Sequence, residues 1–189
     1  MKHDSNHHTG LSREKWLEMA IATMASECKS KFSLDSLLKA MPVSKGSFYW
    51  HFKNRADFLF ALVDYWDRHD TQSVVEALNS LPDDATAADK LWELMCSIYE
   101  QQYGRYDLLM RSLTLEFPDM RKAVGRVDKK RYQNVRQLFS DMGFEGDELE
   151  MRTLAFTTTT SMDQLLLVDM PDDVYERQLK LRHKFFIRP

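Results

Sequence analysis

Apolar residues recur at helical spacing along most of the chain. In the first such stretch, which Ser12 can cap, they form an i, i+1, i+4, i+5 stripe from Trp16 to Cys28. Further helices are expected at residues 34–41, 44–52, 55–78, 86–103, 106–115, 118–141, 147–167 and 171–186. Glycine and proline are few, at 6 and 5 residues, and runs that alternate apolar and polar residues are rare. The pattern predicts an all-α protein.

The stretch from residue 33 to residue 57 holds two short predicted helices joined by a tight turn. Ser33 and Ser44 are suitable N-cap residues for these helices, and Pro42 ends the first of them. Asn54 then opens a third, longer helix. With the preceding helix, this arrangement describes a three-helix helix-turn-helix head, followed by a C-terminal helical bundle.

The same stretch is basic. Between residues 29 and 55 six lysines and arginines accompany one aspartate, so the local net charge is +5 in a chain whose net charge is −3. A basic island in an acidic protein suits contact with phosphates, which supply much of the affinity of DNA-binding proteins. The alternative is an ordinary helical hairpin with a solvated face.

The segment VSKGSFYWHFKNRADFLFALV, residues 43–63, resembles the recognition-helix signature of the TetR family of transcriptional regulators. The positions in register with the signature are Val43, Ser44, Gly46, Phe48, Tyr49, His51 and Phe52. The resemblance covers residues 12–65, about a third of the chain, and the YWHFKN segment is similar in particular to the multidrug-efflux repressors. The family usually has glycine in the turn where this chain has Pro42, so the turn is expected to close differently.

The resemblance also implies which residues of the head contact DNA. The candidates are Ser33, Ser44, Lys45, Ser47, Tyr49, Trp50, His51 and Lys53. Lys45 and Ser47 are the candidates for contacts to base edges, whereas Tyr49 and Lys53 are expected at phosphates. For Trp50 two roles remain open, a contact to the sugar-phosphate backbone or a cover for the helix.

Four segments follow from the predicted elements and the resemblance. They are a disordered tail at 1–10, a helix-turn-helix DNA-binding domain at 11–55, a connector helix at 56–80, and a ligand-binding and dimerisation domain at 81–189. In family proteins the connector carries the ligand signal to the head.

The C-terminal half is rich in aromatic residues and methionine. Methionine is deformable, so it suits a pocket that adapts to apolar ligands. The resemblance implies that some of these residues line a small-molecule site, whereas a plain hydrophobic core is the alternative for each one. The ligand-binding candidates are Trp92, Met95, Cys96, Tyr99, Tyr103, Met110, Phe117, Phe156 and Met162.

In the family, the last two long helices of each subunit form a four-helix dimer interface. The hydroxyl-rich run at residues 157–161 would allow close approach of such helices, or it would face the pocket. The dimer-interface candidates are Leu154, Thr158, Met162, Leu165, Leu166, Tyr175, Leu179, Arg182 and Phe186.

Other functional classes lack support in the sequence. The motifs HExxH, GxSxG and the P-loop are absent, and Cys28 and Cys96 are far apart, so we expect no enzyme, no metal site and no cofactor. No apolar run approaches the ~18 residues of a membrane span, and the N-terminal residues do not resemble a signal peptide. A cytoplasmic protein with reduced thiols is therefore expected.

Together these features predict a homodimeric, DNA-binding transcriptional regulator. The expected form is a repressor that a small apolar or amphipathic ligand releases from a palindromic operator. The alternative is a global regulator or an activator with a TetR-like head and no small-molecule ligand. A cavity of at least a few hundred Å³ in the second domain would distinguish a ligand-responsive regulator from this ligand-independent alternative.

Overall fold

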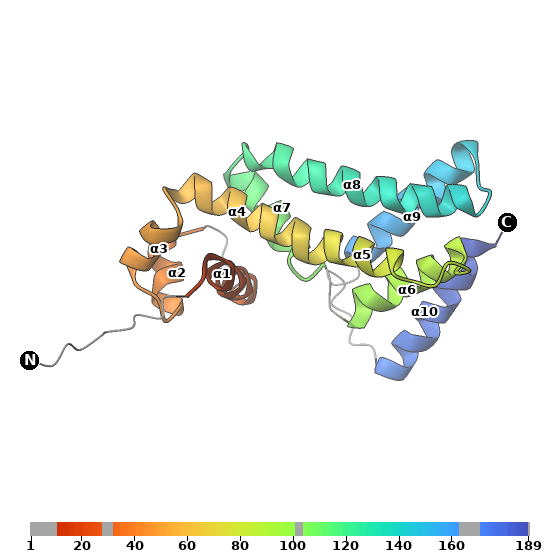
Figure 1. Ribbon diagram of the computed structural model, residues 1–189, viewed down its shortest axis with the longest axis horizontal. Coiled ribbons are helices and arrows are strands. Elements are labelled where there is room, and N and C mark those ends of the chain that lie inside the picture. The colour runs from red at the N-terminus through yellow and green to blue at the C-terminus, as the bar shows by residue number, and fades with distance from the viewer. Residues whose placement is uncertain (1–10, 28–31, 101–103, 163–170, 189) are drawn as a thin grey trace, which may run out of the picture.

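The computed structural model describes residues 11–27, 32–100, 104–162 and 171–188 (Figure 1). Its elements are α1 (Arg13–Glu27), α2 (Leu34–Ala40), α3 (Lys45–His51), α4 (Arg55–Asp67), η1 (Arg68–Gln72), α5 (Ser73–Asn79), α6 (Ala87–Glu100), α7 (Asp107–Glu116), α8 (Met120–Asp141), α9 (Gly146–Met162) and α10 (Asp172–Ile187). No strand occurs in these described ranges, which confirms the predicted all-α fold. Within the same ranges, no helix combines the length and the apolar character needed to cross a membrane.

The ends of the head helices are set by the side chains that the sequence suggested. The Ser33 hydroxyl accepts a hydrogen bond from the Ser36 amide at 3.3 Å, and the Ser44 hydroxyl accepts one from the Ser47 amide at 3.1 Å. Such caps each contribute about 1 kcal/mol. They fix where α2 and α3 begin, and so fix which residues α3 presents to solvent.

The turn that contains Pro42 closes without a glycine. The Val43 amide donates to the Met41 carbonyl at 2.8 Å, which is the hydrogen bond of a γ-turn centred on Pro42. The φ angle near −65° that the proline ring imposes is compatible with an inverse γ-turn. The departure from the family pattern is therefore accommodated by a different, equally local turn.

An aromatic cluster holds the head together. Trp16 of α1 lies edge-on to Phe48, Phe52 and Phe58, with ring centroids 5.3 to 5.6 Å apart. All four side chains are at most 1% exposed. Edge-to-face pairs add roughly 0.5–1.5 kcal/mol each to the hydrophobic term, so this cluster fixes α3 against α1 and α4.

One long helical segment leads from the head into the rest of the molecule. It consists of α4, the π-helical turn η1 and α5, and it crosses the molecule from the head towards α6 in Figure 1. The π turn is accompanied by a hydrogen bond from the Ser73 hydroxyl to the His69 carbonyl. It places two polar residues, Asp70 and Thr71, in buried positions. Single π turns inside helices are often found at functional sites.

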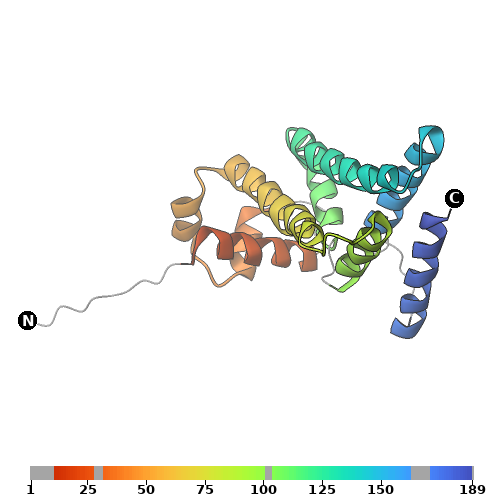
Figure 2. The ribbon, with the colours of Figure 1, turned by 45° about the vertical axis from the view of Figure 1, so that its right-hand side comes forward.

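The buried apolar residues form two cores. The first core joins α1 to α4 with α7 and the first half of α8, and the second core joins α6 with the second half of α8, α9 and α10. Figure 2 shows α10 at the end of the molecule opposite the head. The division into four segments at residues 10, 55 and 80 stays a prediction, because packing alone does not mark independent units.

Candidate nucleic-acid interface and ligand cavity

One side of α3 packs into the first core, and the other side is open to solvent. Phe48 and Phe52 lie on the packed side, whereas Tyr49 is 55% and Trp50 is 84% exposed. Lys45, one turn before Tyr49, is also exposed. Basic and aromatic side chains on the outer face of a short helix can reach phosphates and base edges in a major groove. This face is the candidate nucleic-acid interface.

The remaining DNA-binding candidates have local partners as well as access to solvent. Ser33 and Ser44 accept hydrogen bonds as N-caps, which leaves each hydroxyl proton available to a phosphate oxygen. The ring nitrogen Nε2 of His51 lies 2.8 Å from the Leu11 carbonyl oxygen, and Ser47 is half-buried. Lys53 is exposed between α3 and α4. Contact of these residues with DNA stays a prediction.

A cavity of about 270 Å³ opens in the body, between the connector and helices α6, α8 and α9. Its apolar wall includes Val74, Leu78, Leu94, Ile98 and Phe156. Ligand sites of proteins usually run from about 300 to 1,000 Å³, so this volume indicates a small ligand.

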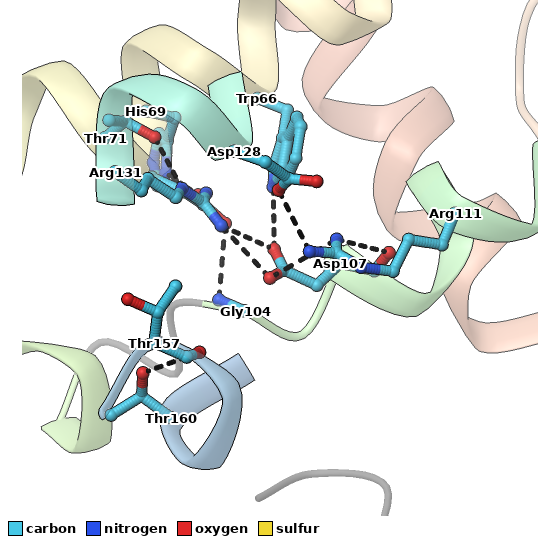
Figure 3. Close-up of polar contacts among 11 residues, drawn as sticks. Trp66, His69, Thr71, Gly104, Asp107, Arg111, Asp128, Arg131, Thr157 and Thr160 are labelled. Atoms are coloured by element: carbon cyan, nitrogen blue, oxygen red, sulfur yellow. Dashed lines mark hydrogen bonds and ion pairs between the residues drawn. The ribbon is translucent and has the colours of Figure 1, made fainter. Parts of the chain in front are cut away.

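The floor of the cavity is a buried polar network around Asp107 (Figure 3). The Asp107 carboxylate accepts hydrogen bonds at 3.0 Å from Nε1 of Trp66 and from Nη1 of Arg131. The Arg131 guanidinium also donates to the Thr71 hydroxyl at 2.8 Å, and its carbon Cζ lies 4.4 Å from the Trp66 ring centroid. Asp107 is only 2% exposed, so its charge is compensated by these contacts rather than by water.

Asp70 is the second buried carboxylate at the cavity floor. Its oxygen Oδ1 lies 3.0 Å from Nδ1 of His69, and its oxygen Oδ2 accepts a long hydrogen bond of 3.4 Å from the Gly104 amide. Burial raises the pKa of the Asp70 carboxyl, although hydrogen bonds from His69 and Gly104 and the charge of Arg131 act in the opposite direction. The negative charge of Asp70 is therefore stabilised by weaker contacts than the charge of Asp107, which accepts hydrogen bonds from Trp66 and Arg131.

The cavity contains only one of the described aromatic and sulfur-containing candidates, Phe156. Trp92, Met95, Cys96 and Tyr99 belong to the second core or pack against it, and Met110 and Phe117 do the same in the first core. Tyr103 lies outside the described residues, as does the side chain of Met162, the last residue of α9. Ligand contact by these residues stays a prediction.

The geometry of α6 explains this distribution. Lys90, Leu94 and Ile98 repeat every four residues and face the cavity. Trp92 and Tyr99 point instead towards α10, where Tyr99 stacks on Tyr175 at a centroid distance of 4.4 Å and Trp92 meets His183. An amphipathic helix packed on both sides carries two apolar faces, and composition alone does not distinguish them.

A contact outside the cavity joins the helix-turn-helix head to α7. The Glu116 carboxylate at the end of α7 accepts a hydrogen bond from Arg55 at 2.8 Å and another from the Phe32 amide at 2.7 Å. The Arg55 guanidinium also covers the Phe117 ring, with Cζ 4.1 Å from the centroid. Since Asp107 lies at the other end of α7, this helix connects the cavity floor with the first turn of α4.

Helices α9 and α10 expose several large apolar side chains. Met151 and Leu154 of α9 are 55% and 60% exposed, and Leu181 and Phe185 of α10 are 63% and 70% exposed. Leu181 and Phe185 share a shallow hollow with Arg152 of α9. Large exposed apolar groups on a surface are typical of sites where a partner binds.

The dimer-interface candidates divide between this surface and the interior. Leu154 and Thr158 are exposed, whereas Leu179 and Phe186 are buried in the second core. Tyr175 stacks on Tyr99, and the Arg182 guanidinium lies 5.6 Å from the Tyr175 centroid. Leu165 and Leu166 lie outside the described residues. Which of them meet a second subunit stays a prediction.

Comparison with known proteins identifies the fold. The crystal structure of the regulatory protein TetR from Rhodobacter sphaeroides superimposes with a TM-score of 0.65 and 21% identity, over 91% of this chain and 95% of that one. A protein of unknown function from Rhodococcus sp. RHA1 superimposes with a TM-score of 0.60 and 17% identity, over 98% of both chains. The resemblance to TetR-type proteins is thereby confirmed, and the chain has their fold.

A sequence relative matches only a part of the chain. The transcriptional regulator AcuR of Cereibacter sphaeroides is 34% identical over 59 residues, which are 31% of this chain and 27% of AcuR. The chain therefore matches about a quarter of the length of that relative. No protein-family model matches the chain.

Proposed function

We propose that this chain is a homodimeric transcriptional regulator whose affinity for a palindromic operator is controlled by a small molecule in the cavity, in the simplest case a repressor. The main support for this proposal is that α4, η1 and α5 form one continuous helical segment. Phe58 at one end belongs to the head core, and Asp70 and Thr71 further along line the cavity. A ligand that displaces the cavity wall acts directly on the helix that positions α3.

The exposed apolar residues of α9 and α10 support the dimer. A twofold dimer would place two copies of α3 in successive major grooves, about one helical turn apart, and would match a palindromic site. The AcuR relative, whose name is that of a transcriptional regulator, supports a role in transcription regulation.

Control by a ligand has an energetic requirement. The ligand must bind the DNA-free form more tightly than the DNA-bound form, and a difference of about 1–3 kcal/mol changes operator affinity by roughly 5- to 150-fold. The Glu116 contact supports a second route for this coupling, since α7 joins the cavity floor to the head.

The proposal is tested by selecting DNA from a random library with the purified full-length chain. We expect enrichment of a symmetric site with half-sites about 10 base pairs apart. Operator affinity is then measured with and without compounds that occupy the cavity. Failure to enrich any sequence would contradict the DNA-binding role, and an unchanged affinity with every cavity-bound compound would contradict ligand control.

Two exposed lysines of the head, Lys45 and Lys53, are predicted to play different roles. Lys53→Ala should weaken binding to all sequences equally and should reduce the slope of log affinity against log salt by about one per protomer, as expected for a lost phosphate contact. Lys45→Ala should cost about 1–3 kcal/mol at the operator and relax its specificity, as expected for a lost base contact.

Fluorescence anisotropy over a series of salt concentrations, with operator and scrambled DNA, measures both effects. Lys180→Ala on α10 is the matched control, since Lys180 is exposed at the end of the molecule opposite the head. If Lys45→Ala leaves the specificity profile unchanged, Lys45 contacts phosphate rather than a base.

The junction between head and body supplies a further prediction. Glu116→Ala should lower the free energy of unfolding by about 1–2 kcal/mol, because the variant loses two charge-assisted hydrogen bonds at a half-buried site. It should also accelerate hydrogen exchange of the Phe32 amide. Chemical denaturation and amide exchange check the two effects, with the exposed Glu76→Ala as the control. Unchanged protection of Phe32 would show that this contact does not hold the head.

The second candidate function is a regulator or activator without a small-molecule ligand. The cavity volume of about 270 Å³ lies slightly below the usual range of ligand sites, so a cavity that stays without a ligand is compatible with it. The same operator measurements separate the two, since a ligand-independent regulator selects an operator but does not respond to cavity-bound compounds.

A further inference from the structure

The cavity floor holds one carboxylate without a full cationic partner. Asp107 is compensated by Arg131 and the Trp66 N–H, and Nη1 of Arg111 lies 3.7 Å from its oxygen Oδ2. Among the described residues, the oxygen atoms of Asp70 accept hydrogen bonds only from the ring of His69 and, at a long distance, from the Gly104 amide. The Asp70 side chain is 2% exposed, so water does not replace the missing partner.

The described cavity lining holds two cations, Arg131 and Lys90, and Arg131, which acts on both carboxylates of the floor, is already engaged. Arg131 donates through Nε to Thr71 and through Nη1 to Asp107, and its planar face covers the Trp66 ring. A ligand carboxylate placed there would face two acidic side chains and one occupied guanidinium. The floor therefore disfavours an anion and favours a positive charge or a strong hydrogen-bond donor.

A second polar group on the cavity wall lacks a partner. The Thr157 hydroxyl oxygen is buried and forms no hydrogen bond with the part of the chain that the structure describes, although Thr157 lines the cavity. Thr157 belongs to α9, and Figure 3 shows it with Gly104 and Arg131, which line the same cavity. A buried hydroxyl without a hydrogen bond is unfavourable, because its lost hydration is not replaced, so it is a suitable contact for a polar ligand group.

The rest of the cavity accommodates an apolar body. Val74, Leu78, Leu94, Ile98 and Phe156 all belong to its lining. The volume of about 270 Å³ equals about nine water volumes of ~30 Å³ each. A ligand of roughly nine non-hydrogen atoms fits this space.

From these observations we propose that the cavity selects small amphipathic cations, with an ammonium group at Asp70 and a short hydrocarbon body against the apolar wall. Asp70 lies in the π turn of the connector to the head, so a ligand bound there could act on DNA binding. That regulatory effect rests on the proposed function. The proposed chemical class of the ligand rests only on the residues that line the cavity.

The test uses three probes of equal chain length and different head groups. n-Octylammonium, n-octanol and n-octanoate are titrated into the purified full-length protein by isothermal calorimetry, without DNA. We expect octylammonium to bind with one site per chain and about ten- to a hundredfold more tightly than octanoate, as expected for a buried charged hydrogen bond. Tighter binding of octanoate, or no binding of octylammonium, would overturn the proposal.

Variants locate the site. Asp70→Asn keeps the shape of the side chain and should weaken octylammonium about ten- to a hundredfold, while octanol changes by less than about twofold. Asp141→Asn, at an exposed acid of the cavity rim, is the matched control and should change neither probe by more than about twofold. Leu94→Trp, which fills the cavity, should abolish binding of both. Unchanged octylammonium binding in Asp70→Asn would overturn the assignment to Asp70.

A last measurement separates this inference from the proposed function. Operator affinity is compared with and without octylammonium in the wild type and in Asp70→Asn. Binding in the cavity without an effect on operator affinity would contradict the proposed regulation and leave the ligand class intact. Regulation by octanoate that persists in Asp70→Asn would support the proposed function and overturn the ligand class.

Discussion

Replacing Asp107 with alanine is expected to lower the free energy of unfolding by about 3–5 kcal/mol. The substitution removes the carboxylate that accepts hydrogen bonds from Trp66 and Arg131 at the floor of the cavity. The Arg131 side chain is 17% exposed, so its charge would remain in a largely dry site beside an unpaired indole N–H. Removal of one partner from a buried ion pair costs more than the pair itself contributes, because the other charge stays behind.

Chemical denaturation of matched variants checks this prediction. Asp128→Ala removes an aspartate that also pairs with an arginine, Arg111, but whose side chain is 44% exposed, and it should cost less than about 1 kcal/mol. The double replacement Asp107→Leu with Arg131→Met should cost much less than the sum of the two single replacements. Similar small losses for Asp107→Ala and Asp128→Ala would show that water reaches the Asp107 network.

Replacing Leu154 and Phe185 together with glutamate is expected to convert the dimer into monomers and to reduce operator affinity by on the order of 10²- to 10⁴-fold. Both side chains are large, apolar and more than half exposed, one on α9 and one on α10. In a dimer that buries this surface, each glutamate would lose its hydration without gaining a cationic partner. Loss of the dimer removes the second head, and with it the gain in affinity from simultaneous binding of two half-sites.

Sedimentation velocity and operator titration measure the two consequences. Leu115→Glu is the matched control, because Leu115 is 86% exposed on α7 and lies outside the exposed surface of α9 and α10. It should leave both the oligomeric state and the operator affinity unchanged. A dimeric Leu154→Glu, Phe185→Glu variant would place the interface elsewhere, and a monomeric wild type would contradict the proposed dimer.

The helices of the head could be predicted because their ends depend on local chemistry. Ser33, Ser44 and Asn54 each cap the helix that the sequence assigned to them, and each cap involves only residues three positions away. A similar local contact occurs at the start of α6, where the hydroxyl of Thr86, just before the helix, donates to the carboxylate of Asp89 in its first turn. Interactions over three residues are contained in the sequence and need no knowledge of the tertiary fold.

The residues of the cavity floor were not predicted, although the sequence contained a signal for two of them. Arg131 lies on the same stripe of α8 as Val124, Val127 and Val135, at spacings of three and four residues. A charged residue on an otherwise apolar stripe indicates a buried ion with a partner elsewhere. Asp70 follows the same rule, because it lies four residues after Trp66 and four before Val74.

The position of the cavity required the tertiary structure. Aromatic and methionine residues of α6 were expected to line it, yet the face of α6 towards the cavity carries Lys90, Leu94 and Ile98. Both faces of α6 are apolar, so which face borders empty space depends on how α8, α9 and α10 pack around it. Periodicity identifies a buried face but does not show what lies opposite to it.

The sequence alone established the helical class, the capped helix-turn-helix and its likeness to TetR-type heads, since caps, turns and periodicity act over a few residues. The tertiary structure decided the rest. It placed a π turn in the connector, paired Asp107 with Arg131 across 24 residues of sequence and left Asp70 facing an apolar cavity. These features depend on contacts between residues far apart in the chain, and such contacts form only when the helices are packed together.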